Sequence, residues 1–358
     1  MSIPLSFKAA VIPTARAQNV VTTRSLALLS PDEIGIRITA TAINPVDWKM
    51  RDHEALLPSY PAVIGSDAAG IIVSLGSSIK NFAIGDRVFF QGIIGDYDSS
   101  TFQEYCKMPA ALVGKTPHSV SDEQVAGVSL AIVAAVTAFY DKSGHGMTPP
   151  WDVGGDKVGN GKAVVILGGA SSVGQYAIQM AKLSGFERVV TNASINNHEL
   201  LRSLGADVVL DRAKSSPEDF KAALGNYPLD FVFDSISSSQ TQVLGVQVLQ
   251  VTNTVHGHLV VLYIVDPETP NPDAIALGTQ NQPKVEVKQV LGIGSAPHLR
   301  YLSEPLFMYL GGDNGYIATG ILKANRPKIV TGGLEAVEEA LELNKKGVSA
   351  EKVVLVLK

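Results

Sequence analysis

One short stretch constrains the fold of this chain more than any other. The apolar run Ala163 to Leu167 leads directly into a turn rich in glycine and serine, and apolar side chains at helical spacing follow. The run is typical of a strand buried on both faces of a parallel sheet. In the turn, Gly169, Ser171 and Gly174 fill the three positions of the G-x-G-x-x-G fingerprint, with serine in the middle. Backbone N–H groups and the positive end of a helix dipole face a pyrophosphate in such a turn. We therefore expect a dinucleotide site; the alternative is a structural turn that binds nothing.

Length and charge narrow the class of protein. A chain of 358 residues exceeds the roughly 250–300 at which single cores stop growing, so two domains are expected. The net charge of −5 gives no reason to expect a nucleic acid or an anionic membrane as partner. We see no secretory leader and no apolar run near the ~20 residues of a membrane span.

Cysteine usage points to a reducing compartment. The single cysteine, Cys106, cannot form a disulfide within the chain, so a cytoplasmic location is expected. Cys106 lies in the alternating segment 102–108, which favours a buried strand residue over a nucleophile.

The pattern of elements changes along the chain. Residues 1–130 show short strands separated by Gly and Pro, typical of a barrel-like domain. Residues 131–305 alternate strand and helix, which predicts a doubly wound sheet. Residues 306–358 end in a strand, which we expect to return to the first domain and leave a cleft beside the inserted cofactor domain. The Gly- and Pro-rich segment 144–162 is either an idle insertion or part of the pocket mouth.

Several motifs then point to a known family. They are Ala42 to Lys49, Gly65 to Gly70, Gly85 to Val88, Phe102 to Tyr105, the glycine turn, Leu204 to Asp207, and Gly347 to Val354. In residues and order the chain resembles the medium-chain dehydrogenase/reductase superfamily, in its zinc-free quinone oxidoreductase and enoyl reductase branch. Within that branch it is most similar to fungal stand-alone, trans-acting enoyl reductases. The resemblance implies an α/β fold with a GroES-like β-barrel catalytic domain (1–130 and 306–358) and a doubly wound Rossmann domain that binds NADP (131–305).

The resemblance also bears on metal. Zinc members of the superfamily hold a catalytic ion through a Cys in the first motif and a His in the second. Here those stretches offer Pro45 and Asp47, then Ser66 and Asp67, and the four cysteines of a structural zinc are absent. We expect no metal.

The residues after the glycine turn indicate the cofactor. A site that prefers NAD carries Asp or Glu about 20 residues beyond the glycines. That count leads to Ser194, and no carboxylate occurs there before Glu199. Ser194 and Asn196 can accept a 2′-phosphate without repulsion, and Arg212 could supply positive charge. NADPH is therefore expected; the alternative is a site that accepts both cofactors.

The chemistry expected of a metal-free site is hydride addition to an activated double bond. Such a reaction needs donors for the developing enolate and a source of protons. Lys49, in a turn that borders the nicotinamide pocket in the resembling family, is the leading candidate. It could hold the cofactor ribose, stabilise the enolate oxygen or relay a proton; the alternative is a lysine that faces solvent. Asp47 is expected to orient the turn, and Tyr60 is a weaker candidate for the acid.

The resemblance also implies a set of cofactor contacts. Thr137 and Ala138 should meet the nicotinamide, Ala170, Ser171, Ser172 and Val173 the pyrophosphate, and Ser194 and Asn196 the adenosine phosphate. Leu262 and Tyr263 should flank the nicotinamide ribose, Leu291, Gly292, Ile293 and Gly294 should line the carboxamide, and Pro45, Lys49, Arg212 and Ser349 complete the set.

The leading hypothesis is an NADPH-dependent reductase of an enoyl thioester or a small enone. Quinone reduction, or a protein that binds NADPH without turnover, remain alternatives. The resemblance allows a carrier protein of a polyketide synthase as partner. Monomer and homodimer stay open, because Pro267, Pro270, Pro272 and Pro283 crowd the expected sheet edge and proline cannot donate to a ladder.

Overall fold

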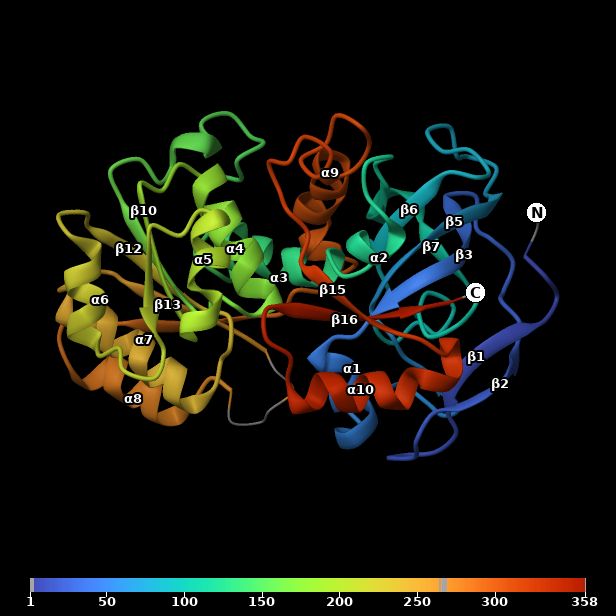
Figure 1. Cartoon of the computed structure of the whole chain (residues 1–358), viewed down its shortest axis with the longest axis horizontal. Coiled ribbons are helices and arrows are strands. Elements are labelled where there is room, and N and C mark those ends of the chain that lie inside the picture. Colours follow the sequence, from blue (N-terminus) through green and yellow to red (C-terminus); the bar gives the residue numbers. More distant parts are fainter. Residues whose placement is uncertain (1–2, 264, 266–268, 358) are drawn as a thin grey trace. The chain divides into compact units, whose positions relative to one another are not determined.

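The computed structural model describes residues 3–263, 265 and 269–357. It divides into two compact units, residues 1–130 with 293–358, and residues 131–292 (Figure 1). The chain thus returns to the first unit at Ile293, earlier than the boundary at 306 that the sequence suggested. Two contacts account for this earlier return: the Gly294 N–H donates to Gln91 Oε1 at 2.9 Å, and the helix beginning at Arg300 packs on a strand of the first unit.

The second unit is built on one parallel sheet. Its strands are β9 (Ala163–Leu167), β10 (Arg188–Ala193), β11 (Val208–Asp211), β12 (Leu229–Asp234), β13 (His258–Leu262) and β14 (Glu286–Val290). They lie in the order β11-β10-β9-β12-β13-β14, and every neighbouring pair is parallel. This is the doubly wound arrangement that the alternating pattern predicted, with β9 and β12 flanking the point where strand order reverses. The sequence pattern predicts a strand over residues 258–264. Its last residue, Ile264, and Pro267 lie outside the described residues.

Helices cover this sheet. They are α3 (Ser129–Tyr140), α4 (Ser172–Leu183), α5 (His198–Ser203), α6 (Pro217–Leu224), α7 (Ser239–Val251) and α8 (Pro272–Gln280), with 3₁₀ turns at Gly155–Lys157 and Ile195–Asn197. On one face of β9, Ala163, Val165 and Leu167 pack in a buried cluster with side chains of α6, α7 and α8. Val164 and Ile166 are also fully buried, so both faces of β9 lie in the core. Burial of both faces explains why the sequence of β9 is an unbroken apolar run.

The first unit holds two sheets. Its strands are β1 (Phe7–Ile12), β2 (Val20–Arg24), β3 (Glu33–Ala42), β4 (Ala62–Val63), β5 (Asp67–Leu75), β6 (Arg87–Gln91), β7 (Tyr105–Pro109), β8 (Val113–Lys115), β15 (Arg326–Val330) and β16 (Glu351–Val356). The larger sheet runs β15-β16-β3-β5-β6-β8, with β7 also paired to β3, and the smaller runs β2-β1-β4. As the sequence predicted, the final strand joins this unit, and it lies between β15 and β3 rather than at an edge.

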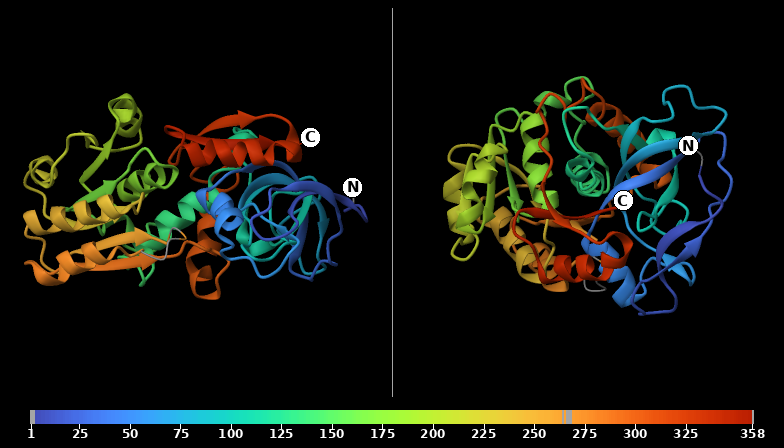
Figure 2. Two further views of the ribbon diagram at one scale, coloured as in Figure 1. Left: turned by 90° about the horizontal axis from the view of Figure 1, so that it is seen from below. Right: turned by 45° about the vertical axis from the view of Figure 1, so that its right-hand side comes forward.

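Four α-helices accompany these sheets among the described residues of the unit. They are α1 (Pro45–His53), α2 (Asp122–Val125), α9 (Arg300–Leu310) and α10 (Val337–Lys346), with 3₁₀ turns at Ala110–Leu112, Pro297–Leu299 and Gly333–Ala336. Helix α10 lies beside β16 and also contacts α1 (Figure 2). Arg51 of α1 is almost fully buried there, and its guanidinium bonds carboxylates of Glu338 and Glu342 on α10. These ion pairs fasten α1 to the C-terminal helix.

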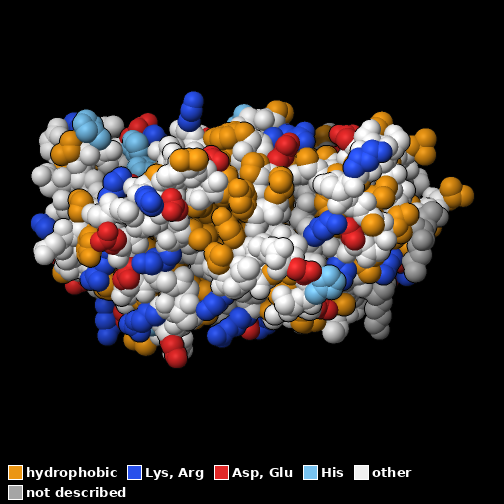
Figure 3. Space-filling view, turned by 90° about the horizontal axis from the view of Figure 1, so that it is seen from above, with side chains coloured by type: hydrophobic (Ala, Val, Ile, Leu, Met, Phe, Trp, Pro, Cys, Tyr) orange, Lys and Arg blue, Asp and Glu red, His pale blue; other side chains and the backbone are white. Residues whose placement is uncertain are grey.

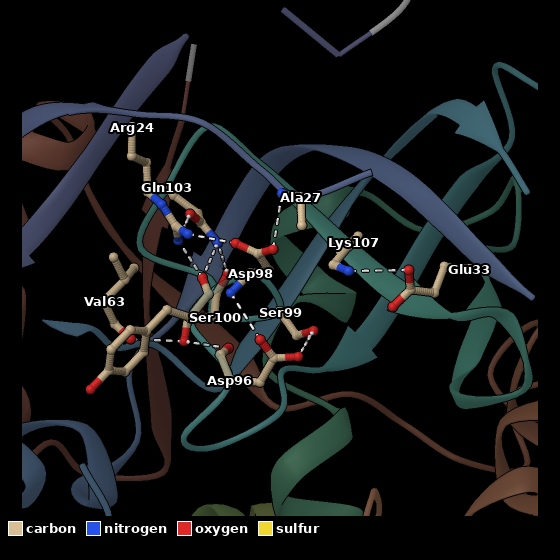
Figure 4. Close-up of polar contacts among 11 residues, drawn as sticks. Arg24, Ala27, Glu33, Val63, Asp96, Asp98, Ser99, Ser100, Gln103 and Lys107 are labelled. Atoms are coloured by element: carbon tan, nitrogen blue, oxygen red, sulfur yellow. Dashed lines mark hydrogen bonds and ion pairs between the residues drawn. The ribbon is translucent and has the colours of Figure 1, made fainter. Parts of the chain in front are cut away.

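The loop between β6 and β7 is tied down by polar contacts. Arg24 Nη2 lies 2.5 Å from Asp98 Oδ1, and Arg24 also donates to Gln103 Oε1 at 2.8 Å (Figure 4). At the ends of the loop, the N–H groups of Gly92 and Thr101 donate to the carbonyls of Ser66 and Gly65. The loop therefore holds the turn that contains Ser66 in one position.

The surface carries charges of both signs, and the most apolar helical stretch and the cysteine are buried. On the face shown in Figure 3, cationic and anionic side chains are interspersed. The described residues include one helical stretch, Asp122–Tyr140, with the length and apolar character of a membrane span, and 83% of it is buried within the structure, as in a core helix. Cys106 is fully buried in β7, and desolvation raises the pKa of its thiol, which makes it a poor nucleophile.

Candidate functional site

The glycine turn of the second unit is shaped by close backbone approach. Gly168 has φ +76, and its N–H donates to Asn192 Oδ1 at 2.8 Å. A Cβ on Gly169 would lie 2.2 Å from Thr191 Oγ1, and one on Gly174 would lie 2.4 Å from the Gly168 carbonyl oxygen. A larger residue would have to displace the buried Thr191 side chain at Gly169 and the backbone of the turn at Gly174, which is the physical reason for glycine in the fingerprint.

Ser171 begins α4. Its side chain accepts a hydrogen bond from the Gly174 N–H at 2.9 Å, and its hydroxyl lies 2.9 Å from that of Ser235. The middle serine of the fingerprint is thus the N-cap of the helix as well as a small residue. Ala170, Ser171, Ser172 and Val173 are each half-buried, so this helix N-terminus is partly open to a ligand. The cradle and the dipole of a 12-residue helix fit the pyrophosphate of a dinucleotide.

The carboxyl end of β10 is the next part of this site. Ser194 there is half-buried, while Asn196 and Glu199 are exposed. Arg212 follows β11, and its backbone N–H donates to the Ala193 carbonyl at 3.0 Å. Asp211 and Ala193, the last residues of β11 and β10, are paired, and they are followed directly by the exposed Arg212 and by Ser194. The three residues that the sequence selected for a 2′-phosphate come from one corner of the sheet.

The strand ends β13 and β14 carry Leu262, Tyr263, Leu291 and Gly292. Leu262 is half-buried and its N–H donates to Ser237 Oγ at 2.8 Å; Tyr263 is exposed and its N–H donates to the Val290 carbonyl at 2.8 Å. Leu291 is exposed and Gly292 half-buried. These residues form the carboxyl edge of the sheet, where ligands bind in open α/β folds.

Other residues of the expected cofactor set lie elsewhere. Thr137 and Ala138 are buried in α3, and the Thr137 hydroxyl donates to the Val133 carbonyl at 2.8 Å. The half-buried Ile293 and the buried Gly294 belong to the first unit, so the stretch 291–294 is divided between the units. The Gly294 carbonyl accepts a hydrogen bond from the Ser303 hydroxyl of α9 at 2.6 Å.

The first unit contains a buried polar cluster of five residues: Asn44, Asp47, Ser66, Asp67 and Lys352. Asp47 accepts hydrogen bonds from the Asn44 N–H at 2.7 Å and the Ser66 hydroxyl at 2.8 Å. The Asn44 side-chain amide donates to Asp67 Oδ2 at 3.0 Å. The Lys352 ammonium donates to Asn44 Oδ1 and lies 3.4 Å from Asp67 Oδ2.

Charge in the buried polar cluster is unbalanced, because two carboxyl groups share one ammonium. Desolvation raises the pKa of Asp47 to about 7, against hydrogen bonds from Asn44 and Ser66 that favour the ionised form. Desolvation also raises the pKa of Asp67, while Lys352 opposes that shift. Near neutral pH the cluster therefore holds a proton that an exposed carboxyl pair would release.

The remaining predicted residues lie on or near α1. Lys49 is half-buried, and its ammonium is 5.4 Å from the centroid of the Trp48 ring. Pro45 is the exposed first residue of α1, and Ser349 is exposed just before β16. Tyr60 has a buried hydroxyl without a hydrogen-bond partner among the described residues, and desolvation raises its pKa.

Sequence reasoning missed Asn44 and Lys352. A signal was available for Asn44, because an asparagine before a helix-starting proline is a typical N-cap. Lys352 gives a weaker signal: it is a cation at the start of an otherwise apolar strand, and nothing local indicates its partners.

The buried polar cluster does not fit a zinc ion. Zinc in proteins is bound mainly by thiolate, imidazole and carboxylate groups. Here two carboxylates are joined by an amide, a hydroxyl and an ammonium, and the ammonium itself bonds Asn44 and Asp67. Across the described part of the chain, no group of three or more His, Cys, Asp or Glu side chains could hold a metal.

Comparison with protein-family models identifies both units. Residues 30–118 match the alcohol dehydrogenase GroES-like domain, and residues 172–272 match the zinc-binding dehydrogenase family. A trans-enoyl reductase of Aspergillus japonicus, himH, is 35% identical over 337 residues, covering 90% of this chain and 89% of the relative. The chain belongs to the medium-chain dehydrogenase/reductase superfamily. The resemblance inferred from the motifs is confirmed, including the likeness to fungal trans-enoyl reductases.

Two further comparisons place this medium-chain reductase among its relatives. The NADPH-dependent alkenal/one oxidoreductase of Arabidopsis thaliana is 31% identical, covering 66% of the chain and 58% of that protein. An alcohol dehydrogenase superfamily protein from Novosphingobium aromaticivorans shares the fold with a TM-score of 0.77 at 22% identity, covering 98% and 100% of the two chains. The homologues support an oxidoreductase that acts on carbon–carbon double bonds and binds a nicotinamide cofactor.

Proposed function

We propose that this protein is an NADPH-dependent reductase of double bonds conjugated to a carbonyl, either enoyl thioesters or enones, and that it works without a bound metal. Its homologues include proteins named trans-enoyl reductase and alkenal/one oxidoreductase. The observation that carries the choice of cofactor is the corner formed by Ser194, Asn196 and Arg212.

That corner favours a phosphorylated ribose. Between the end of β10 and α5 the chain offers a serine hydroxyl and an asparagine amide, and Arg212 adds a fixed positive charge beside them. An aspartate or glutamate at this strand end would instead bind a ribose diol and repel a phosphate. Glu199 is exposed on α5, one turn further along the chain. Ala170 to Val173 at the start of α4 would hold the pyrophosphate.

The other proposed cofactor contacts have less structural support than those at the corner and at the start of α4. They are Pro45, Lys49, Thr137, Ala138, Leu262, Tyr263, Leu291, Gly292, Ile293, Gly294 and Ser349. Burial of Thr137 and Ala138 limits them to backbone or packing contacts, because the Thr137 hydroxyl proton already has an acceptor.

In the proposed chemistry Lys49 acts on the substrate carbonyl. When bound, the reduced nicotinamide supplies a hydride. Hydride addition at the β-carbon moves negative charge to the carbonyl oxygen, and the α-carbon then takes a proton. Lys49 is half-buried, so less water screens its ammonium, which therefore stabilises that charge more than a fully exposed ammonium would. Lys49 is the catalytic residue of this proposal.

A metal-free reaction is consistent with the donor set. Alkene reduction by hydride creates an enolate, whose charge hydrogen-bond donors or a cation can stabilise. Oxidation of an alcohol needs strong alkoxide stabilisation, which a bound metal usually provides. The buried polar cluster offers an ammonium and two carboxyl groups instead of a zinc ligand set.

Turnover tests the proposal directly. Purified protein is incubated with NADPH or NADH and with a crotonyl thioester, a small enone, a quinone, or an enoyl chain tethered to a carrier domain, while cofactor absorbance is followed. We expect oxidation of NADPH by the thioester or the enone. Reduction of quinones alone would favour the quinone reductase alternative, and tight NADPH binding without turnover would favour a binding protein. Faster reduction of the tethered chain would support a polyketide synthase partner.

A further inference from the structure

Lys352 is the most deeply buried lysine that the mechanism does not use. Its side chain is 5% exposed, and it enters the buried polar cluster from β16, the last strand. Burying an ammonium is costly unless charged and polar partners surround it. Its ammonium contacts Asn44 Oδ1 and Asp67 Oδ2.

Both partners of Lys352 hold the first turn of a helix: Asn44 precedes α1, and Asp67, the first residue of β5, contacts α3. Asn44 is the N-cap of α1, with extended backbone angles (φ −118, ψ 154), and its N–H bonds Asp47 in the first turn. Asp67 Oδ1 accepts the N–H of Leu130, the second residue of α3, at 2.8 Å. One ammonium therefore fixes the side chains that hold the first turns of α1 and α3.

We infer that Lys352 is a positioning residue: through Asn44 it fixes the N-terminal turn of α1, and thereby the location of Lys49. This inference rests on the proposed role of Lys49. The link is short, because α1 has only nine residues and Lys49 is its fifth. The far end of α1 is fastened separately, by the ion pairs of Arg51 with Glu338 and Glu342 on α10. Loss of the Lys352 contact would free the end of α1 that those ion pairs do not hold.

The chain offers two independent ways to disturb Lys352. Lys352→Met keeps most of the aliphatic stem and removes the ammonium. Gly127→Ala keeps the ammonium but displaces the stem, since a Cβ on Gly127 would lie 2.4 Å from Lys352 Cγ. Lys328→Met is the matched control: Lys328 lies on the neighbouring strand β15 and pairs with Glu351 at the surface.

Trp48 provides a readout that does not depend on turnover. It lies next to Lys49 on α1, its Nε1–H donates to Asn344 Oδ1 at 3.1 Å, and Trp151 is the other tryptophan of the chain. In a Trp151→Phe background, Trp48 alone reports on α1. We expect Lys352→Met and Gly127→Ala to shift Trp48 emission and raise its accessibility to a soluble quencher at least twofold. Lys328→Met should change neither, and circular dichroism should show that all three variants remain folded.

Turnover supplies the second readout. Lys352→Met should lower kcat about tenfold or more with a smaller change in KM for NADPH, and the same substitution in a Lys49→Met background should lower kcat by less than twofold. An equal loss in both backgrounds would show that Lys352 does not act through Lys49. Unchanged Trp48 emission in both Lys352→Met and Gly127→Ala would overturn the inference. If the protein reduces none of the acceptors, the proposed function fails, and the Trp48 measurement still decides whether Lys352 positions α1.

Discussion

The backbone N–H of Arg212 donates a hydrogen bond of 3.0 Å to the carbonyl oxygen of Ala193. The contact joins the residue that leaves β11 to the last residue of β10, immediately before Ser194. It places a permanent cation at the strand end that we propose binds the 2′-phosphate of NADPH.

Arg212→Gln should therefore weaken NADPH binding selectively. The substitution removes a charge-assisted contact with the 2′-phosphate, a type of hydrogen bond worth about 1.5–3 kcal/mol, which corresponds to about tenfold or more in KM for NADPH. KM for NADH should change less than twofold. Steady-state kinetics with both cofactors measures this, and equal effects on the two would contradict the assignment.

Ser194→Asp should shift preference in the same direction by another route. A carboxylate at the end of β10 repels a 2′-phosphate and can bind a ribose diol. We expect the ratio of kcat/KM for NADPH over NADH to fall at least tenfold. Ser203→Asp, on α5 beyond this corner, is a control for added negative charge and should leave the ratio unchanged.

Lys49→Met should reduce kcat by a larger factor than it raises KM for NADPH. Removing one electrostatic donor to an oxyanion costs about a hundredfold or more in other enzymes. Lys49→Arg should recover part of the loss, because the charge is kept. An unchanged kcat in Lys49→Met would contradict the proposal, because Lys49 would then have no role in the mechanism.

Asp47 makes the stability of the protein depend on pH. Its pKa is about 7 in the folded state and near 3.8 when unfolded, so the folded protein retains a proton that the unfolded chain releases. The contribution of Asp47 is therefore full below about pH 4 and is lost as pH rises towards 7. Asp47→Asn should remove this dependence. The check is the difference in unfolding free energy between the two proteins across this range, which we expect to change by a few kcal/mol; a flat difference would mean that Asp47 is ionised throughout.

Gly174→Ala should weaken both fold and cofactor binding. The added Cβ would meet the Gly168 carbonyl oxygen at 2.4 Å, so α4 must move away from the turn. Forced overpacking of this kind costs typically about 1–3 kcal/mol. Thermal unfolding and NADPH titration should both register the change. Gly161→Ala is the comparison: open space surrounds a Cβ there, but its backbone φ of +72 strains an alanine, so it should lower thermal stability without weakening NADPH binding.

The sequence predicted the parts of this fold whose signals are local. The apolar run of β9, the glycine turn and the helix after it required only neighbouring residues. The same holds for α6: the residue pattern predicts a helix over 217–224, and the structure has a helix over Pro217–Leu224. Strand β14, with the sequence Glu-Val-Lys-Gln-Val at the edge of the sheet, was missed because polar residues interrupt its apolar pattern. The helices α7 and α8 were missed as well.

Long-range contacts account for the missing part of the site. Asn44 and Lys352 are separated by 308 positions, so no periodicity can connect them. Asp67 could be predicted as a member of a buried charge pair, but its partner could not. The second boundary between the units depends on the hydrogen bond from Gly294 to Gln91, which again joins segments far apart in the chain.

The place of β16 between β15 and β3 has a consequence for biosynthesis. Residues 131–292 form a contiguous unit that a ribosome delivers in one piece. The first unit, in contrast, receives the strand β16 and the Lys352 ammonium only after the whole of residues 131–292 has been made. The sheet of the first unit therefore stays incomplete while the other unit is synthesised. Deletions that remove β16 should yield chains that chaperones bind or proteases degrade, and not shorter folded proteins.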